Sequence, residues 1–242
     1  MEPKTMEQPA GNPLATAPIG ELLRRYSIPT TLTLLVNYLY NIADQIFVGQ
    51  GVGITGMAAT NVAFPLTIVT IALALLLGDG CAANLNLCLG RGEQEQANRI
   101  ISHTASLMVG VGILLGIAGS LLAKPIVILF GATETSFQAV LDYTRIIVWG
   151  LPFLLFSSAL ASIIRADGNP KFTMKCMMLG AGINLVLDPV FIFCLHMGVV
   201  GAAIATVLGQ AVAGTLCLLH LRRLQSVRIE RRWLRPALPV TL

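Results

Sequence analysis

Long apolar runs recur along the chain and determine its class before any motif is considered. A helix needs about 20 apolar residues to cross a hydrocarbon core of roughly 30 Å, and six runs reach that length. They are continuous, whereas the strands of a transmembrane barrel alternate apolar and polar positions. The pattern therefore predicts six membrane-spanning helices, over about 26–49, 56–80, 100–122, 140–163, 172–195 and 199–221.

Composition supports an all-α membrane protein. Hydrophobic residues make up 55% of the chain and charged residues only 12%, about half the charged fraction of a typical soluble domain. A soluble fold could not cover so much apolar side chain with a polar coat. We predict three segments: a disordered cytosolic tail at 1–20, a six-helix transmembrane bundle at 21–222 and a basic cytosolic linker at 223–242.

The basic residues give an orientation. If the N-terminus is cytoplasmic, Lys124 and Arg145 are the two Lys or Arg residues in predicted outer segments, and the other fourteen are cytoplasmic. Cytoplasmic loops carry the excess of Lys and Arg in inner-membrane proteins. An even number of spans then places both termini in the cytoplasm, and we expect a multi-pass protein of the cell inner membrane.

A polar stripe interrupts the first apolar run. Asn37, Asn41 and Asp44 are spaced i, i+4 and i+7 and so share one helix face, and Tyr40 precedes Asp44 by four residues. Ionisable groups within a membrane are costly, and each marks a functional site by default. Asn37 and Asn41, the neutral amides of this stripe, are candidates for lining a substrate cavity.

A second acid lies in the fifth run. Asn184 and Asp188 are four residues apart, and Thr206 lies in the sixth run. At 1.5 Å per residue, Asp44, Asp188, Asn184 and Thr206 all fall roughly 18–27 Å from the inner end of their spans. We therefore expect these four side chains to share one layer in the outer half of the membrane.

Two close carboxylates in a low dielectric cannot both ionise cheaply, so Asp44 and Asp188 should share a proton or a small cation such as Na⁺. Uptake of that ion would change the local charge and could shift helix packing. Pro29, fifteen residues before Asp44, is a candidate hinge. A structural polar network that only locks the helices together is the alternative interpretation. No other metal and no organic cofactor is expected.

Several strings together resemble the multidrug and toxic compound extrusion (MATE) family over about residues 14–235. They are VNYLYNIADQIFVGQGVG, LGRGEQEQANR, RADGNPK, NLVLDP and GVVGAAIATVLGQ. The resemblance implies the N-terminal six-helix lobe of a 6+6 transporter, with a cation site at Asp44, Asn184, Asp188 and Thr206 and with Tyr40 nearby. It also implies that H⁺ or Na⁺ entry drives export of organic, often cationic, drugs.

The resemblance covers one lobe, whereas the family is built from two. We therefore expect a truncated or split transporter, or a lobe that pairs with a second lobe or with its own copy. A non-transporting interaction subunit is an alternative, as is a lipid-linked glycan flippase of related fold, which would favour a more cationic cavity. No GxxxxGK[ST], GxSxG or metal-binding spacing is present, so we expect neither an enzyme nor ATP drive. The net charge of +4 requires no nucleic-acid partner.

Overall fold

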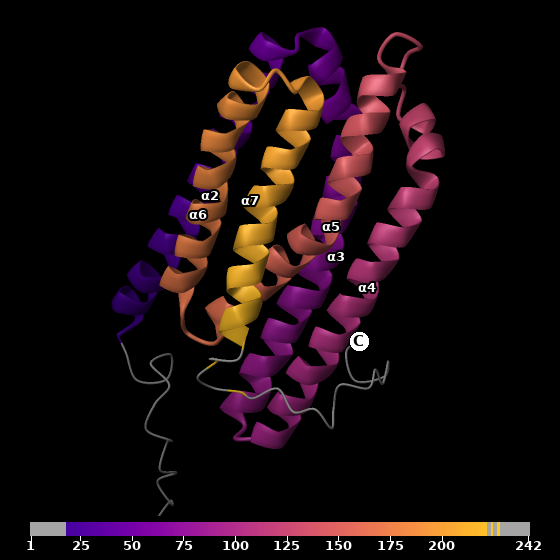
Figure 1. Ribbon diagram of the computed structural model, residues 1–242. Helices are drawn as coiled ribbons and strands as arrows, with labels where there is room; N and C mark the ends of the chain where they lie inside the picture. The colour runs from indigo at the N-terminus through magenta and orange to yellow at the C-terminus, as the bar shows by residue number, and fades with distance from the viewer. Residues whose placement is uncertain (1–17, 222–223, 225–226, 228–242) are drawn as a thin grey trace, which may run out of the picture.

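The computed structural model describes residues 18–221, apart from the side chains of Leu22 and Arg25, together with Leu224 and Val227. This part of the chain is all-helical, with six long helices, as the apolar runs predict (Figure 1). They are α2 (Ile19–Gly51), α3 (Ile54–Gly90), α4 (Gln94–Leu129), α5 (Phe137–Ala166), α6 (Pro170–Pro189) and α7 (Gly198–His220).

Most helices extend beyond the predicted spans, because hydrophobicity marks the part of a helix that lies in lipid and not the ends of its hydrogen-bond ladder. For example, α3 continues ten residues past the predicted end at 80. Ile19 and Gly20, at the end of the predicted tail, already belong to α2. The rest of that tail, and the predicted linker apart from Leu224 and Val227, lie outside the described residues.

The fifth predicted span is not one regular helix. After Pro189 the backbone forms a π-helical turn, η1 (Val190–Cys194), closed by a hydrogen bond from Leu195 N to Val190 O at 3.0 Å. Proline lacks an N–H and disrupts the regular ladder, which accounts for a change of helix type at this point. π-Turns of this kind frequently occur at functional sites, and this one begins two residues after Asp188.

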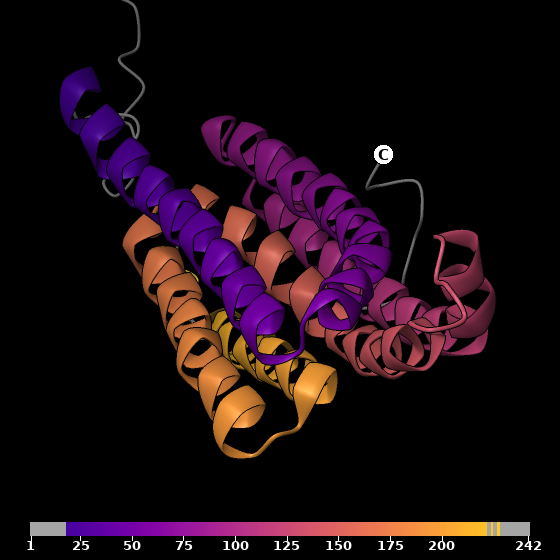
Figure 2. The ribbon, with the colours of Figure 1, turned by 90° about the horizontal axis from the view of Figure 1, so that it is seen from above.

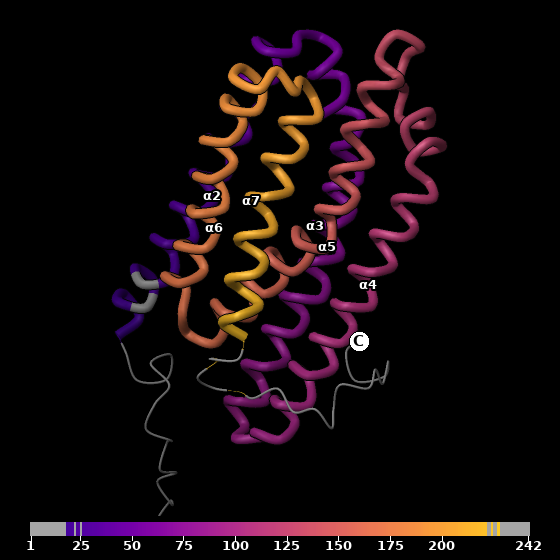
Figure 3. The backbone as a smooth tube through the Cα atoms, in the orientation of Figure 1, coloured from indigo at the N-terminus to yellow at the C-terminus, as the bar shows by residue number. Residues whose placement is uncertain are grey.

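Five of the described helices are long and apolar enough to cross a membrane, with α6 and η1 acting as one. The remaining helix, α2, has 33 residues and is long enough, but its polar stripe lowers its hydropathy. The helices run alternately up and down, so α2 begins and α7 ends at the same face (Figure 3). This alternation is the topology that six consecutive spans require.

The core centres on α5, which packs against α3, α4 and α7. Its membrane segment is the most buried of the five candidate spans. The helix changes direction part-way along (Figure 1) and contains Pro152, a usual cause of such a bend. One hydrophobic cluster lies at each end of the bundle, around Leu155 and Ile164 on one side and around Val148 and Leu151 on the other.

Helices α6 and α7 cross at unusually short range. A Cβ placed on Gly180 would lie 2.7 Å from the carbonyl oxygen of Gly209, and one on Gly209 would lie 2.6 Å from that of Gly180. Small residues of this kind let membrane helices approach closely. The turn between the two helices uses positive φ at His196 (55°) and Gly198 (58°).

By contrast, α2 packs mainly along α6 and diverges from α3 after their shared turn (Figure 2). Its end near that turn is anchored on η1: the rings of Phe47 and Phe193 meet edge to face with centroids 6.4 Å apart, and Gly51 lies against Ile192. The helix that carries the polar stripe is thus attached to the bundle mostly through α6.

Candidate functional site

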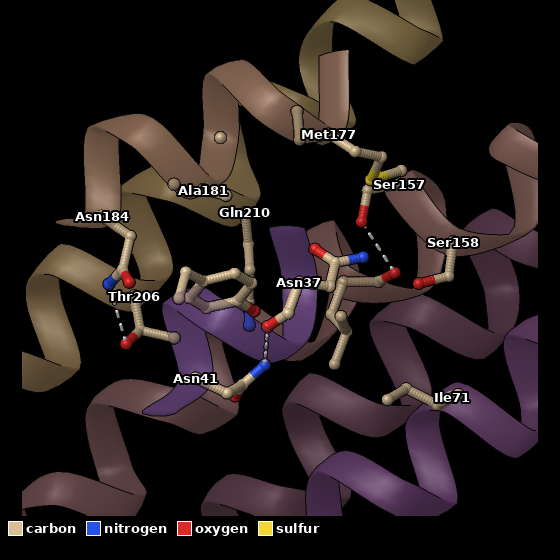
Figure 4. A pocket seen from close by; sticks show the side chains of 15 residues that line it. Asn37, Asn41, Ile71, Ser157, Ser158, Met177, Ala181, Asn184, Thr206 and Gln210 are labelled. Carbon is tan, nitrogen blue, oxygen red and sulfur yellow. Dashed lines mark hydrogen bonds between the residues drawn. The ribbon is translucent and has the colours of Figure 1, made fainter. Parts of the chain in front are cut away.

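A cavity of about 210 Å³ opens between α2, α3, α5, α6 and α7 (Figure 4). Five of the seven residues that the sequence nominated for ion or substrate binding line it: Asn37, Tyr40, Asn41, Asn184 and Thr206. Ser157 and Gln210 add further polar groups, while Ile71, Leu154 and Met177 supply apolar wall. The lining is therefore mixed, with amide and hydroxyl groups facing an apolar surface.

The α6–α7 crossing brings Asn184 and Thr206 together. Because Gly209 lies against Asn184 in the antiparallel register, Thr206, one turn earlier on α7, faces the same level of α6. Asn184 Nδ2 donates to Thr206 Oγ1 at 3.4 Å, which is long for such a bond (Figure 4). The structure thus brings these two residues into contact across α6 and α7.

The two acids also meet. Asp188 is fully buried and Asp44 is 9% exposed. Their carboxyl groups lie within interaction range of each other, with Asp44 on α2 and Asp188 on α6, and Asn184 lies beside Asp188. A contact between two carboxyl groups is a hydrogen bond only when one of them carries a proton.

The buried oxygens around the acids lack donors. Among the described residues, no side chain donates a well-formed hydrogen bond to either oxygen of Asp188, to Asp44 Oδ1 or to Asn184 Oδ1. Buried polar atoms are normally paired, and each exception requires an explanation. Buried carboxylate oxygens that lack a well-formed hydrogen bond are suited to binding a proton or a small hard cation.

Three further polar residues surround the acids, two of them near the carboxyl groups and one reached through Gln45, and the sequence analysis did not find them. Tyr143 of α5 is buried and lies near both Asp44 and Asp188. Gln45 Nε2 donates to Asp44 Oδ2 at 3.3 Å, and Thr60 Oγ1 of α3 donates to Gln45 Oε1 at 3.2 Å. Tyr143 and Thr60 lie on other helices, so only the position of Gln45 next to Asp44 could have indicated a role.

The remaining nominated residues are placed as follows. Asn41 Nδ2 donates to the carbonyl oxygen of Asn37 at 2.7 Å, so the polar stripe is partly bonded within α2 (Figure 4). Pro29 lies inside α2, and Thr33 Oγ1 donates to its carbonyl oxygen at 2.7 Å. Hinge motion at Pro29 stays a prediction. Among the described residues, no group of three or more His, Cys, Asp and Glu side chains is placed to hold a metal ion.

Comparison with known families identifies the architecture. The family model described as MatE matches residues 29–190, about two thirds of the chain. The chain belongs to the MATE family. Members of this family are multi-pass membrane transporters and not enzymes, which confirms the resemblance seen in the sequence and the expectation of a non-enzyme.

Curated MATE relatives match over most of this chain. A protein named FAD transporter from Shewanella oneidensis is 33% identical over 208 residues, which cover 84% of this chain and 46% of that protein. The multidrug export protein MepA of Staphylococcus haemolyticus is 26% identical over 205 residues, covering 85% of this chain and 45% of its own. The chain thus spans about half the length of these relatives.

Solved structures show the same relation. One is a MOP superfamily transporter from Pyrococcus furiosus that is described as having a binding pocket of reverse polarity. It superposes with a TM-score of 0.82 at 31% identity, over 90% of this chain and 48% of the transporter's chain. The MATE multidrug transporter DinF-BH, solved as a complex, gives a TM-score of 0.81 at 36% identity, over 88% of this chain and 48% of the DinF-BH chain. The described helices therefore form one lobe of the two-lobed MATE fold.

Proposed function

We propose that this chain is one six-helix lobe of a cation-coupled antiporter that exports organic, often cationic, compounds from the cell. Uptake of H⁺ or Na⁺ at Asp44 and Asp188, with Asn184, Thr206 and Tyr40 around them, couples the ion gradient to helix rearrangement. The observation that supports this proposal is the contact between two buried carboxyl groups beside a polar cavity.

The energetics of the acid pair support ion uptake. Two like charges about 4 Å apart repel by about 4 kcal/mol at an effective dielectric constant of 20. One proton or one Na⁺ removes most of that repulsion, so the site favours occupancy by a single cation. When the cation leaves, the repulsion acts between α2 and α6. A ligand shifts a conformational equilibrium only if it binds one conformation more favourably than the other, and relief of this repulsion would provide that difference in free energy.

The cavity chemistry indicates the class of substrate. Its described lining offers amide, hydroxyl and apolar surface and no Lys or Arg. Such a surface fits a neutral or cationic organic molecule and offers little to an anion. The relative named FAD transporter raises a second candidate, a flavin nucleotide. The phosphates of that substrate would need cations from elsewhere, such as a second lobe.

The whole transport cycle requires a second lobe in this proposal, supplied by another polypeptide segment or by a second copy of the chain. The alternatives from the sequence, a non-transporting subunit and a lipid-linked glycan flippase, predict no ion-driven export of small cations. We favour the antiporter over the flippase because a pyrophosphate-linked glycan would require the cationic cavity that the described lining lacks.

Ethidium efflux from cells that lack their own exporters tests the proposal, with the chain expressed alone and together with a second six-helix lobe. We expect export by a two-lobed assembly, and a loss of at least about tenfold on Asp44→Asn or Asp188→Asn, equivalent to about 1.4 kcal/mol or more. Asp142→Asn is the matched control, because Asp142 is bound by Gln138 away from the cavity.

The outcomes separate the candidates. Wild-type export by both Asp44→Asn and Asp188→Asn would overturn the site assignment. Collapse of export on dissipating the proton gradient alone, or the sodium gradient alone, identifies the coupling ion. Release of flavin nucleotide without ethidium efflux would favour the second substrate class.

A further inference from the structure

Gln45 connects an acid of the candidate ion site to a second helix. Its Nε2 donates to Asp44 Oδ2 at 3.3 Å, and its Oε1 accepts from Thr60 Oγ1 of α3 at 3.2 Å. It forms a side-chain hydrogen-bond link between α2 and α3, two helices that otherwise diverge (Figure 2). A change at Asp44 therefore has a direct polar route to α3.

The Thr60 hydroxyl has two acceptors but one hydrogen. Its Oγ1 lies 3.2 Å from Gln45 Oε1 and 3.0 Å from the carbonyl oxygen of Met57, and a hydroxyl can donate to only one of them at a time. The observed amide orientation suits a charged Asp44, because the carboxylate needs a donor and receives Gln45 Nε2. The hydroxyl of Thr60 then donates to Gln45 Oε1.

The same groups form a second satisfied arrangement when Asp44 is protonated. Its O–H then donates to Gln45 Oε1, and the amide turns by about 180° so that Nε2 donates to Thr60 Oγ1. The Thr60 hydroxyl in turn donates to Met57 O. The two arrangements differ in the orientation of one amide and one hydroxyl, and both keep Asp44, Gln45 and Thr60 hydrogen-bonded to one another.

Space for this rearrangement is present. Gln45 and Met57 line an open groove of about 660 Å³ between α2 and α3, together with Asn41 and Gly49. Gln45 is only half-buried and Thr60 is 9% exposed, so the amide can turn while the hydroxyl remains enclosed. The titratable groups that face Asp44 are Asp188 from α6, Tyr143 from α5 and Tyr40 on its own helix.

We propose that Gln45 and Thr60 form a hydrogen-bond relay in which the Gln45 amide reverses when Asp44 gains a proton, so that α3 senses the state of the ion site. The relay rests on the proposed role of Asp44 in ion uptake. It responds to H⁺ and not to Na⁺, because a sodium-bound Asp44 remains a carboxylate and still accepts from Nε2. Gln45 and Thr60 are positioning residues, since they act through Asp44.

Nuclear magnetic resonance of the Gln45 side-chain amide tests the reversal directly, on the ¹⁵N-glutamine-labelled chain in nanodiscs. The resonance is assigned by its loss in Gln45→Met. We expect it to move between pH 8 and pH 5 in the wild type and to stay fixed in Asp44→Asn. Changing Na⁺ for K⁺ at pH 8 should leave it in place. An amide resonance that does not move with pH, or that moves equally in Asp44→Asn, overturns the relay.

Ethidium efflux by the two-lobed assembly tests the functional role of the relay. Thr60→Val keeps the shape of the side chain and removes the hydroxyl, and we expect at least a tenfold loss of ethidium export together with a flatter pH profile. Thr60→Ser keeps the hydroxyl and should stay within twofold of the wild type with its pH profile intact. Wild-type export by Thr60→Val overturns the relay. If Asp44→Asn still abolishes export in that case, the proposed antiporter function stands without it.

Discussion

The crossing of α6 and α7 is the contact on which the position of the cavity residues depends, and Gly180→Ala perturbs it in a defined way. The new Cβ would lie 2.7 Å from the carbonyl oxygen of Gly209 and 3.0 Å from the Cβ of Ala213. Favourable non-bonded contacts begin at about 3.5 Å, so the two helices must part by roughly 0.8 Å at this level.

The expected loss of stability follows from two opposing effects. Overpacking a well-packed site costs about 1–3 kcal/mol, whereas replacing Gly by Ala within a helix returns about 1 kcal/mol. The net change is a loss of up to about 2 kcal/mol. For a chain of this size, 1 kcal/mol corresponds to about 2–4 °C in Tm, so a fall of up to about 8 °C is expected. The bond between Asn184 and Thr206, already 3.4 Å long, should break when the helices separate.

Thermal unfolding of the purified protein in detergent provides the assay, with a thiol-reactive dye that reports exposure of the buried Cys176 and Cys217. Gly182→Ala is the matched control, because it lies on the same helix and its new Cβ would meet nothing within 4 Å. We expect this control to equal the wild type or exceed it by about 1 kcal/mol. Equal Tm values for Gly180→Ala and Gly182→Ala would refute the argument that the crossing leaves no room for a methyl group.

Two further outcomes follow from local structure. Asn169 caps α6, with Oδ1 accepting from Phe172 N at 3.2 Å. Asn169→Ala should therefore lower the stability by about 0.5–2 kcal/mol, while Asn169→Ser stays close to the wild type. The same thermal assay measures both variants, and equal Tm values for the two would contradict the cap. A membrane-permeant maleimide should label the exposed Cys194 well before the buried Cys176 and Cys217 under native conditions. Mass spectrometry of the modified peptides follows the rates, and equal rates would contradict the observed packing.

The number of helices, and the similar depth of Asn184 and Thr206 along their helices, were predictable because both depend on regularities of sequence. Apolar runs of sufficient length mark helices in lipid, and the predicted existence of all six is confirmed. Helix rise alone brought Asn184 and Thr206 to similar depths, and the structure joins them. That calculation succeeds because every membrane span begins at the same boundary of the bilayer, so residue number gives depth. Helices of a soluble fold have no such common boundary.

What the sequence could not supply is lateral arrangement. Helix periodicity does not say which helix faces which, so neither Tyr143 beside the acids nor Thr60 beyond Gln45 could be found. The π-turn after Pro189 was missed for a related reason: proline indicates a disrupted ladder without determining how the backbone restores its hydrogen bonds. These features depend on packing between elements distant in sequence.

The packing also indicates which helix is free to respond to the ion. Backbone contact at Gly180 and Gly209 holds α6 and α7 together, and α7 is in turn packed tightly on α5. Helix α2 meets this group mainly through α6, and it carries one acid of the pair while α6 carries the other. Repulsion between Asp44 and Asp188 after the cation leaves therefore acts across the boundary between α2 and α6, which lacks the glycine-mediated backbone contact that joins α6 to α7. We expect α2 to move against a frame of α5, α6 and α7, because separating α6 from α7 would require breaking the close backbone contact at Gly180 and Gly209.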